Sequence, residues 1–190
     1  MRKTRLLKMR KTRLRIALVA LSLVAAAVAV PSIIGLASAA DDHSRTAVAA
    51  SATARFHDLD AAKAAGWNVL VVDKAGLTCI DNQPVGGMGV HYANASLLFD
   101  ADLDPTQPEA LVYAPNADGQ PKLAALEYIV FDGAWAAAGH TDPPELFGQQ
   151  FAYTPAGNRY GLDPFWSLHV WIWQPNSAGL FQPWNPRVHC

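Results

Sequence analysis

The chain has little positive charge beyond its first 15 residues. Eight of its 15 lysines and arginines lie before Ile16, and seven remain from Ala40 onward against all 16 acidic residues. Seven minus sixteen gives residues 40–190 a formal charge of −9 with histidine neutral. Nucleic-acid binding needs the opposite sign, because basic side chains displace counterions from phosphates. An anionic membrane surface would also repel this part of the chain. Small ligands, neutral polymers and metal cations are left as partners.

Several motifs of common enzyme classes are missing. There is no Gly-x-Ser-x-Gly nucleophile motif, and the run at 86–89 lacks the Gly-Lys-Ser/Thr ending of a phosphate loop. No His-x-His or His-Glu-x-x-His spacing occurs. Asp100, Asp102 and Asp104 resemble the start of a calcium loop. Pro105 stands at the position that needs glycine and Leu111 at the one that needs glutamate, so an EF-hand is excluded.

The first 39 residues have the three parts of a bacterial-type secretory signal. Residues 1–15 are basic, residues 16–30 are apolar and uncharged, and the small residues Ala37-Ser38-Ala39 follow. This pattern predicts cleavage before Ala40, a single domain over 40–190, and a secreted or extracytoplasmic location. The start repeats at Met9, which makes Met9 an alternative initiator to Met1. The alternative to cleavage is a membrane anchor, since the uncharged stretch 16–40 is long enough to span a bilayer. In that case the domain contacts the membrane only through this leader.

The two cysteines, Cys79 and Cys190, are expected to form a disulfide. An isolated pair in an exported protein is typically bridged. The bridge would hold the C-terminus in place. By closing a long loop it would stabilise the fold by about 4–5 kcal/mol in the chain-entropy model. A reactive thiol or a metal ligand is the alternative.

The hydrophobic pattern predicts an α+β fold. Thr46–Phe56 is alanine-rich and is expected to be a helix with Ser44 as its N-cap, and a short helix follows Asp58 and ends at Gly66. The later segments read as a mostly antiparallel sheet. The expected strands are 67–72, 90–92, 110–114, 122–131 and 165–173. The glycine-rich segment 81–89 is expected to be a loop in which the backbone approaches a ligand closely.

Strand alternation selects one candidate site. In segment 168–173, Leu168, Val170 and Ile172 share one face, and His169 shares the other with two tryptophans. Glu127 lies within an apolar strand, where an ionised carboxylate needs a partner. His91 follows the glycine-rich segment. We therefore predict that His91, Glu127 and His169 form a site for zinc or copper, or an acid–base group. The alternative is that each histidine is hydrogen-bonded in the core and that Glu127 pairs with Lys122, Arg159 or Arg187.

Aromatic residues give a second class of hypothesis. Tyr92, Trp171 and neighbouring tryptophans are predicted to line a pocket for a sugar or a small apolar ligand, with Asn94 fixing its orientation. The alternative is that these rings fill the core.

Four segments together resemble a known family. They are 53–58, Gly86-Gly87-Met88-Gly89-Val90-His91-Tyr92-Ala93-Asn94, 108–113, and Leu168-His169-Val170-Trp171-Ile172-Trp173 through Trp184-Asn185-Pro186-Arg187-Val188-His189-Cys190. This pattern resembles a family of exported bacterial proteins to which no activity is assigned. The resemblance implies export and one compact domain, and it implies no catalytic residues.

The sequence thus favours an exported protein that binds a small ligand or a metal through a His/Glu cluster beside an aromatic pocket. A secreted hydrolase or isomerase that uses the same cluster is the first alternative. A structural cell-envelope protein without an active site is the second.

Overall fold

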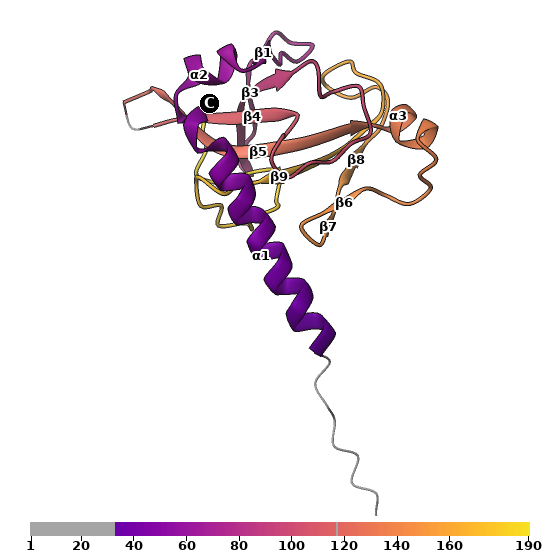
Figure 1. Cartoon of the computed structure of the whole chain (residues 1–190). Coiled ribbons are helices and arrows are strands. Elements are labelled where there is room, and N and C mark those ends of the chain that lie inside the picture. The colour runs from indigo at the N-terminus through magenta and orange to yellow at the C-terminus, as the bar shows by residue number, and fades with distance from the viewer. Residues whose placement is uncertain (1–32, 117) are drawn as a thin grey trace, which may run out of the picture. The chain divides into compact units, whose positions relative to one another are not determined.

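The computed structural model describes residues 33–116 and 118–190. It contains N-terminal helical elements, the first of them 21 residues long, followed by a mostly antiparallel sheet in one compact domain, so the predicted α+β class is confirmed (Figure 1). The helical elements are α1 (Ile33–Thr53), the 3-10 helix η1 (Ala54–His57), α2 (Leu59–Ala64) and α3 (Asp132–Ala137). The strands are β1 (Trp67–Leu70), β2 (Cys79–Asn82), β3 (Gly86–Asn94), β4 (Ala110–Pro115), β5 (Pro121–Phe131), β6 (Glu145–Leu146), β7 (Gln149–Gln150), β8 (Ala152–Thr154) and β9 (Phe165–Val170).

Seven strands form one antiparallel sheet. Its order is β1-β3-β4-β5-β9-β8, and β2 pairs with the other half of the long strand β3. The remaining two strands, β6 and β7, form a separate hairpin. The three strands that carry the candidate site, β3, β5 and β9, therefore lie in the middle of the sheet, with β4 between β3 and β5.

The two faces of the sheet bury different sets of side chains. One face packs against the helical elements through a core that includes Phe56, Tyr113, Leu126 and Leu168. On the other face a smaller apolar cluster joins Val112, Ala125 and Trp171 to Val188 of the C-terminal segment. Because both faces of the sheet are covered, side chains that point to either face are buried along much of β5 and β9.

The N-terminal helix differs from the sequence-based expectation. The chain is already helical at Ile33, so Ser44 lies inside α1 and is not its N-cap, and Phe56 belongs to η1. The physical reason is that alanine-rich sequence continues on both sides of Ser44 without a proline, and alanine is the strongest helix former. The expected helix after Asp58 is confirmed as α2, where the Asp58 carboxylate accepts hydrogen bonds from two backbone amides.

The glycine-rich segment is a strand and not a ligand-binding loop. Gly86 and Gly87 lie in β3, and Gly87 forms an antiparallel bridge to Asn185 of the C-terminal segment. A Cβ atom at Gly86 would collide with the Asn185 backbone carbonyl. These glycines therefore let two backbones approach each other. The prediction of a loop over 81–89 holds only for the turn at 83–85 and was wrong for the residues on either side, which belong to β2 and β3.

The predicted disulfide is confirmed. Cys79 at the start of β2 is bonded to Cys190, across a sequence separation of 111 residues. The bridge and the Gly87–Asn185 pairing attach the C-terminal segment to the sheet at two points.

None of the helices within the described residues combines the length and the hydropathy needed to cross a membrane. Most of the predicted secretory signal lies outside the described residues, and the predicted cleavage point before Ala40 falls within α1.

Candidate metal centre

The strand register brings His91, Glu127 and His169 to one face of the sheet. Glu127 on β5 lies directly opposite His169 on β9. On its other side Glu127 lies opposite Ala110 of β4, which in turn lies opposite Ala93 of β3. His91 is two residues before Ala93 and therefore projects from the same face. His91 itself lies opposite Val112 of β4, so it meets Glu127 diagonally across the intervening strand, past the small side chain of Ala110.

The three side chains are in close contact. His91 Nε2 lies 3.2 Å from His169 Nε2 and 3.3 Å from Glu127 Oε2. The third edge of the cluster joins His169 Nδ1 and Glu127 Oε1, which are 3.4 Å apart. All three residues are buried: His91 is 4% exposed, Glu127 6% and His169 2%. One possible ligand atom from each residue lies within 4.8 Å of those of the other two. The predicted cluster is thus assembled in the structure.

Burial controls the protonation of the cluster. Desolvation lowers the pKa of His91 to about 4, although a hydrogen bond with the Gly89 backbone opposes this change. Desolvation also lowers the pKa of His169 well below its usual value, and the nearby His91 adds to that effect. The pKa of Glu127 is raised to about 8 by desolvation, against a hydrogen bond from the Ser167 side chain. At neutral pH all three groups therefore favour their uncharged forms.

The outer contacts of the cluster orient two of its members. His91 Nε2 faces His169 and Glu127, which leaves Nδ1 as the ring nitrogen that donates to the Gly89 carbonyl. The Ser167 hydroxyl bonds the Glu127 carboxyl group. Metal-binding histidines commonly donate their second ring nitrogen to a backbone carbonyl in this way.

A pocket of about 800 Å³ opens above the cluster. His91 and Glu127 lie at its buried end, and the more exposed lining residues, Phe99 and Leu162, lie at its mouth. Its walls are largely apolar and include Ile129, Phe131 and Phe165 on the same face of the sheet as Glu127. His169 is not among the lining residues, so it closes the cluster from the side away from the pocket.

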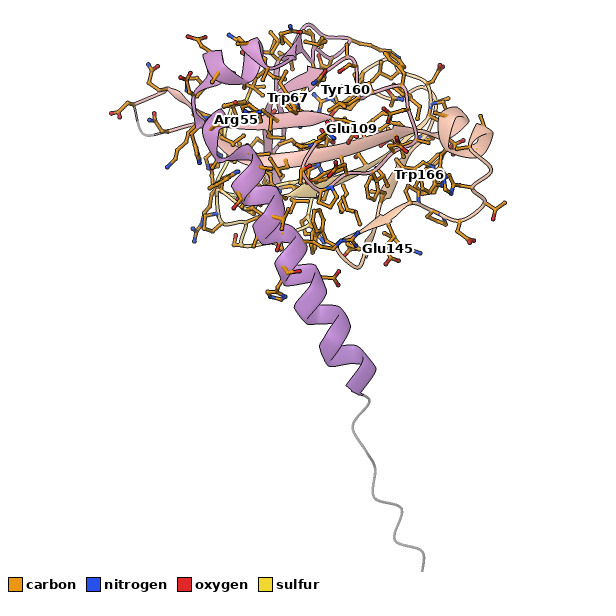
Figure 2. All side chains as sticks on the ribbon, in the orientation of Figure 1. Arg55, Trp67, Glu109, Glu145, Tyr160 and Trp166 are labelled. Carbon is orange, nitrogen blue, oxygen red and sulfur yellow. A yellow bond between two sulfur atoms is a disulfide. The ribbon has the colours of Figure 1, made fainter. Side chains whose placement is uncertain are left out.

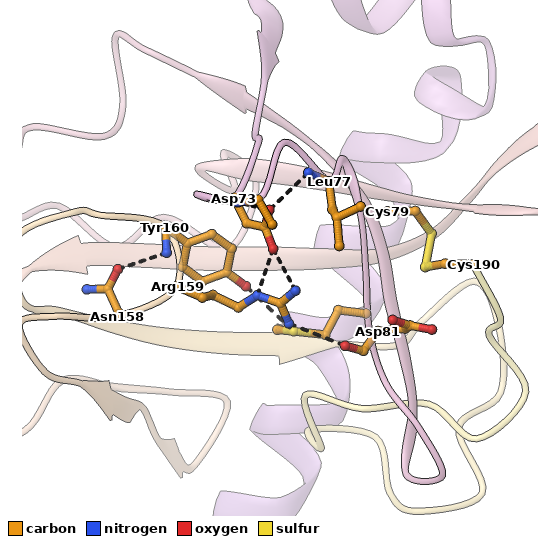
Figure 3. Close-up of polar contacts among 10 residues, drawn as sticks. Asp73, Leu77, Cys79, Asp81, Asn158, Arg159, Tyr160 and Cys190 are labelled. Carbon is orange, nitrogen blue, oxygen red and sulfur yellow. Dashed lines mark hydrogen bonds and ion pairs between the residues drawn. A yellow bond between two sulfur atoms is a disulfide. The ribbon is translucent and has the colours of Figure 1, made fainter.

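An ion pair fixes the segment that supplies one wall of this pocket. Arg159 donates to Asp73 Oδ2 through Nη2 at 2.7 Å and through Nε at 3.2 Å, and its Nη1 donates to the Asp81 carbonyl (Figure 3). Asp73 Oδ1 also accepts from the backbone amides of Ala75 and Leu77, and the Arg159 hydrogen bonds are the main reason that its pKa is lowered. The adjacent residue, Tyr160, lines the pocket, and its hydroxyl contacts Met88 Sδ at 3.8 Å.

This ion pair also bears on the alternative interpretation of Glu127. Arg159 pairs with Asp73 and not with Glu127, and the partners of Glu127 among the described residues are His91, His169 and Ser167. The alternative in which a basic residue neutralises Glu127 is not supported by these contacts.

The predicted ligand-contacting residues lie elsewhere. Tyr92 and Asn94 project from the opposite face to His91, where Tyr92 packs edge-on against Tyr113 and Asn94 Oδ1 accepts from Ser96. Trp171 shares the face of His169, and the two rings stack with centroids 6.2 Å apart. Its Nε1 donates to the Gln182 carbonyl in the core. None of these three residues lines the pocket above the cluster.

Among the residues that line the pocket, His91 and Glu127 were predicted from the sequence, but the apolar wall residues were not. Ile129 and Phe131 are two and four positions after Glu127, so strand alternation placed them on its face. Phe99, Tyr160 and Leu162 lie in segments without regular secondary structure, and only the folded chain brings them to the sheet.

Comparison of the chain with protein-family models, with curated proteins and with solved structures gives no match.

Proposed function

We propose that this chain is an exported protein that binds a divalent transition metal through His91, Glu127 and His169, at the buried end of a small-ligand pocket. The observation that carries the proposal is the spacing of the three side chains. Two imidazoles and one carboxylate form a donor set that suits zinc and copper.

The distances within the cluster fit a tetrahedral ion. With metal–ligand bonds of about 2.0–2.1 Å, neighbouring ligand atoms of a tetrahedral site lie about 3.3–3.4 Å apart. His91 Nε2 lies 3.2 Å from His169 Nε2 and 3.3 Å from Glu127 Oε2, so the two distances that join proposed ligand atoms fit this spacing. Protein hydrogen bonds between such atoms are usually shorter, at about 2.7–3.2 Å. The 3.3 Å separation of His91 and Glu127 exceeds this range and the 3.2 Å separation of the two histidines lies at its upper limit, so both distances suit ligands of a shared ion.

The hydrogen-bonding capacity of the cluster supports the same proposal. With its proton on Nδ1 toward Gly89, His91 presents a lone pair at Nε2. The ion would take this lone pair, Glu127 Oε2 and His169 Nε2. His169 Nδ1 then keeps its proton and faces Glu127 Oε1.

Three protein ligands leave one tetrahedral position open. Zinc sites with a free position bind water or a substrate there, whereas structural sites are closed by four protein ligands. Since His91 and Glu127 line the pocket and His169 does not, we place the open position on the pocket side. This favours binding of a ligand to the ion over a purely structural role.

Export is part of the proposal. The basic and apolar leader, the small residues before Ala40 and the resemblance to exported bacterial proteins support it. The Cys79–Cys190 bridge is compatible with an oxidising compartment outside the cytoplasm.

Calorimetric titration of the purified protein with zinc and with copper tests the metal site. We expect one equivalent to bind, and we expect His91→Ala and Glu127→Gln each to weaken binding by more than about 100-fold, since even outer partners of metal ligands contribute about 10–100-fold. His189→Ala is the matched control, because His189 is exposed and lies outside the cluster. Near-UV circular dichroism of each variant reports whether its core is intact. Unchanged binding in folded His91→Ala and Glu127→Gln proteins would reject the proposal.

A further inference from the structure

We infer that the pocket takes an amphiphilic monoanion, such as a medium-chain carboxylate, whose head group occupies the open position of the metal and whose apolar body fills the pocket. This inference rests on the proposed metal site and names the class of ligand that the site takes.

The distribution of polar atoms in the pocket indicates a ligand with one polar end. The buried end holds His91 and Glu127, while the walls between this end and the mouth are formed mainly by aliphatic and aromatic side chains. A ligand that is polar along its whole length would leave hydrogen-bonding groups without partners against these walls. An apolar body with a single donor group at its inner end matches this arrangement.

The charges around the pocket make the binding of an anion depend on the metal. Its lining includes the carboxyl groups of Glu127, Asp132 and Asp163 and contains no lysine or arginine. Asp132 Oδ1 accepts from Trp166 Nε1. Without a metal, no lysine or arginine among the described lining residues can pair with an anion. A divalent ion bound beside the single carboxylate of Glu127 would give the buried end a net positive charge, whereas Asp132 is half-buried and Asp163 is exposed, so the anionic head group is accepted at the metal alone.

The mouth of the pocket has apolar side chains that a bound ligand would cover. Phe99 is 73% exposed and stacks on Phe131 with ring centroids 5.8 Å apart, and Leu162 is 45% exposed. Both line the pocket. Together they extend the apolar wall to the protein surface, which lets a chain longer than the buried part of the pocket remain in contact with protein.

The wall that faces the sheet is preformed. Tyr160 follows Arg159, whose paired hydrogen bonds to Asp73 hold this segment against the turn at 73–77 (Figure 3). Ligand binding therefore loses less conformational entropy, because this segment is already ordered in the free protein.

Calorimetry with hexanoate, octanoate and decanoate tests the inference on zinc-loaded and on metal-free protein, with zinc binding measured first. On the loaded protein we expect each added CH₂ group to increase affinity about fourfold, the factor for about 0.8 kcal/mol. On metal-free protein we expect decanoate to bind at least about 30-fold more weakly, because its head group has no cation. The neutral probe 1-decanol should lose much less affinity when the metal is removed.

A wall variant makes the test independent of the metal ligands. Phe99→Ala should weaken decanoate binding about threefold to tenfold, since it removes apolar contact at the mouth. Leu180→Ala is the control, because Leu180 is also a large exposed apolar residue, at 41%, but does not line the pocket. Zinc titration of both variants reports whether the cluster is still assembled.

The outcomes separate the two proposals. Zinc binding without decanoate binding, or decanoate binding that is equal with and without zinc, would overturn this inference and leave the metal site standing. An affinity that does not depend on chain length or on Phe99 would also overturn it. Failure to bind zinc or copper would overturn both.

Discussion

Glu127 and His169 lie directly opposite each other on β5 and β9, and Glu127 Oε1 is 3.4 Å from His169 Nδ1. His91 completes the cluster from β3, two strands away from β5, across β4. A buried carboxyl group therefore joins two histidines that are 78 residues apart in the sequence.

Zinc affinity should increase with pH up to about pH 8. Burial raises the pKa of Glu127 to about 8, so below that pH the ion must displace a proton from this group. The His91 imidazole is already neutral at these pH values, because its pKa is lowered to about 4. We expect the affinity to rise about tenfold per pH unit between pH 6 and pH 8, for one proton released, and then to level off. Calorimetry in buffers of different ionisation enthalpy counts the proton; an affinity that is flat over this range would contradict the prediction.

A larger side chain at Ala110 should disrupt the cluster. Ala110 lies on β4 next to Glu127, on the face where His91 and Glu127 meet, and it is fully buried. Ala110→Val should weaken zinc binding at least about tenfold, because overpacking shifts side chains that metal ligation requires in place. Ala114→Val is the matched control, since Ala114 is equally buried on the same strand but lies away from the cluster. Equal zinc affinities in the two variants would show that Ala110 is not needed for the contact.

The pH dependence of stability should depend on Glu109. Its Oε2 accepts from the Ile129 backbone amide at 2.8 Å, and desolvation raises its pKa from 4.5 to about 8. The folded state then holds a proton that the unfolded state releases above pH 4.5, so the stabilisation is complete below pH 4.5 and is lost as pH rises toward 8. We expect a loss on the order of a few kcal/mol between pH 5 and pH 8, part of it also due to Glu127.

Urea unfolding at both pH values measures this effect. Glu109→Gln should reduce the difference between the two free energies of unfolding, because a neutral amide keeps an acceptor for Ile129 and does not titrate. The exposed Glu145, labelled with Glu109 in Figure 2, gives the control Glu145→Gln, which should leave the difference unchanged. If Glu109→Gln also left it unchanged, Glu109 would be ionised in the folded protein.

The Arg159–Asp73 ion pair should stabilise the wall of the pocket. Asp73 is buried, whereas the Arg159 side chain is 36% exposed. The contribution of this pair to stability is therefore expected to lie between those of an exposed and a buried ion pair. We expect Arg159→Gln to lower the free energy of unfolding by about 1–2 kcal/mol. Faster amide hydrogen exchange at 160–163 should accompany this loss. The exposed Arg187, substituted as Arg187→Gln, is the control; equal exchange in the two variants would mean that other contacts hold the segment.

Removal of the disulfide should cost a large part of the stability. The bridge closes a loop across 111 residues, for which the chain-entropy model gives about 4–5 kcal/mol. The double variant Cys79→Ser, Cys190→Ser should lose about this amount in urea unfolding, and the reduced wild-type protein should behave like the variant. A loss below about 1 kcal/mol would show that the Gly87–Asn185 pairing holds the C-terminal segment without the bridge.

Local sequence patterns were sufficient for much of the sheet. The predicted strands at 110–114 and 122–131 correspond to β4 and β5, and the strand predicted at 165–173 begins with β9. Strand β9 ends at Val170 because the chain then turns, and Trp173 and Gln174 donate to the Ala124 carbonyl. Both hydrogen bonds are made to a residue of β5, about 50 residues earlier in the chain. The periodicity of the segment 165–173 therefore could not predict where the strand ends.

The candidate cluster could be predicted because ionisable side chains are unusual within apolar strands. A carboxylate within an apolar strand needs a partner, and alternation separates His169 from Leu168 and Val170. Tyr92 and Asn94 were chosen because they are near His91 in the sequence, and they face the other side of the sheet because neighbours along a strand alternate. The same rule, applied along β5, would have selected Ile129 and Phe131.

The sequence by itself determined the α+β class, the cysteine pair and the faces of the strands that carry His91, Glu127 and His169. These properties follow from composition and from a period of two residues, which are local. Only the tertiary structure decided that β4 lies between β3 and β5 with a small residue at the crossing, and that irregular segments around Phe99 and Tyr160 form the pocket. Strand order and loop position depend on contacts between residues far apart in the chain, so no window of the sequence contains them.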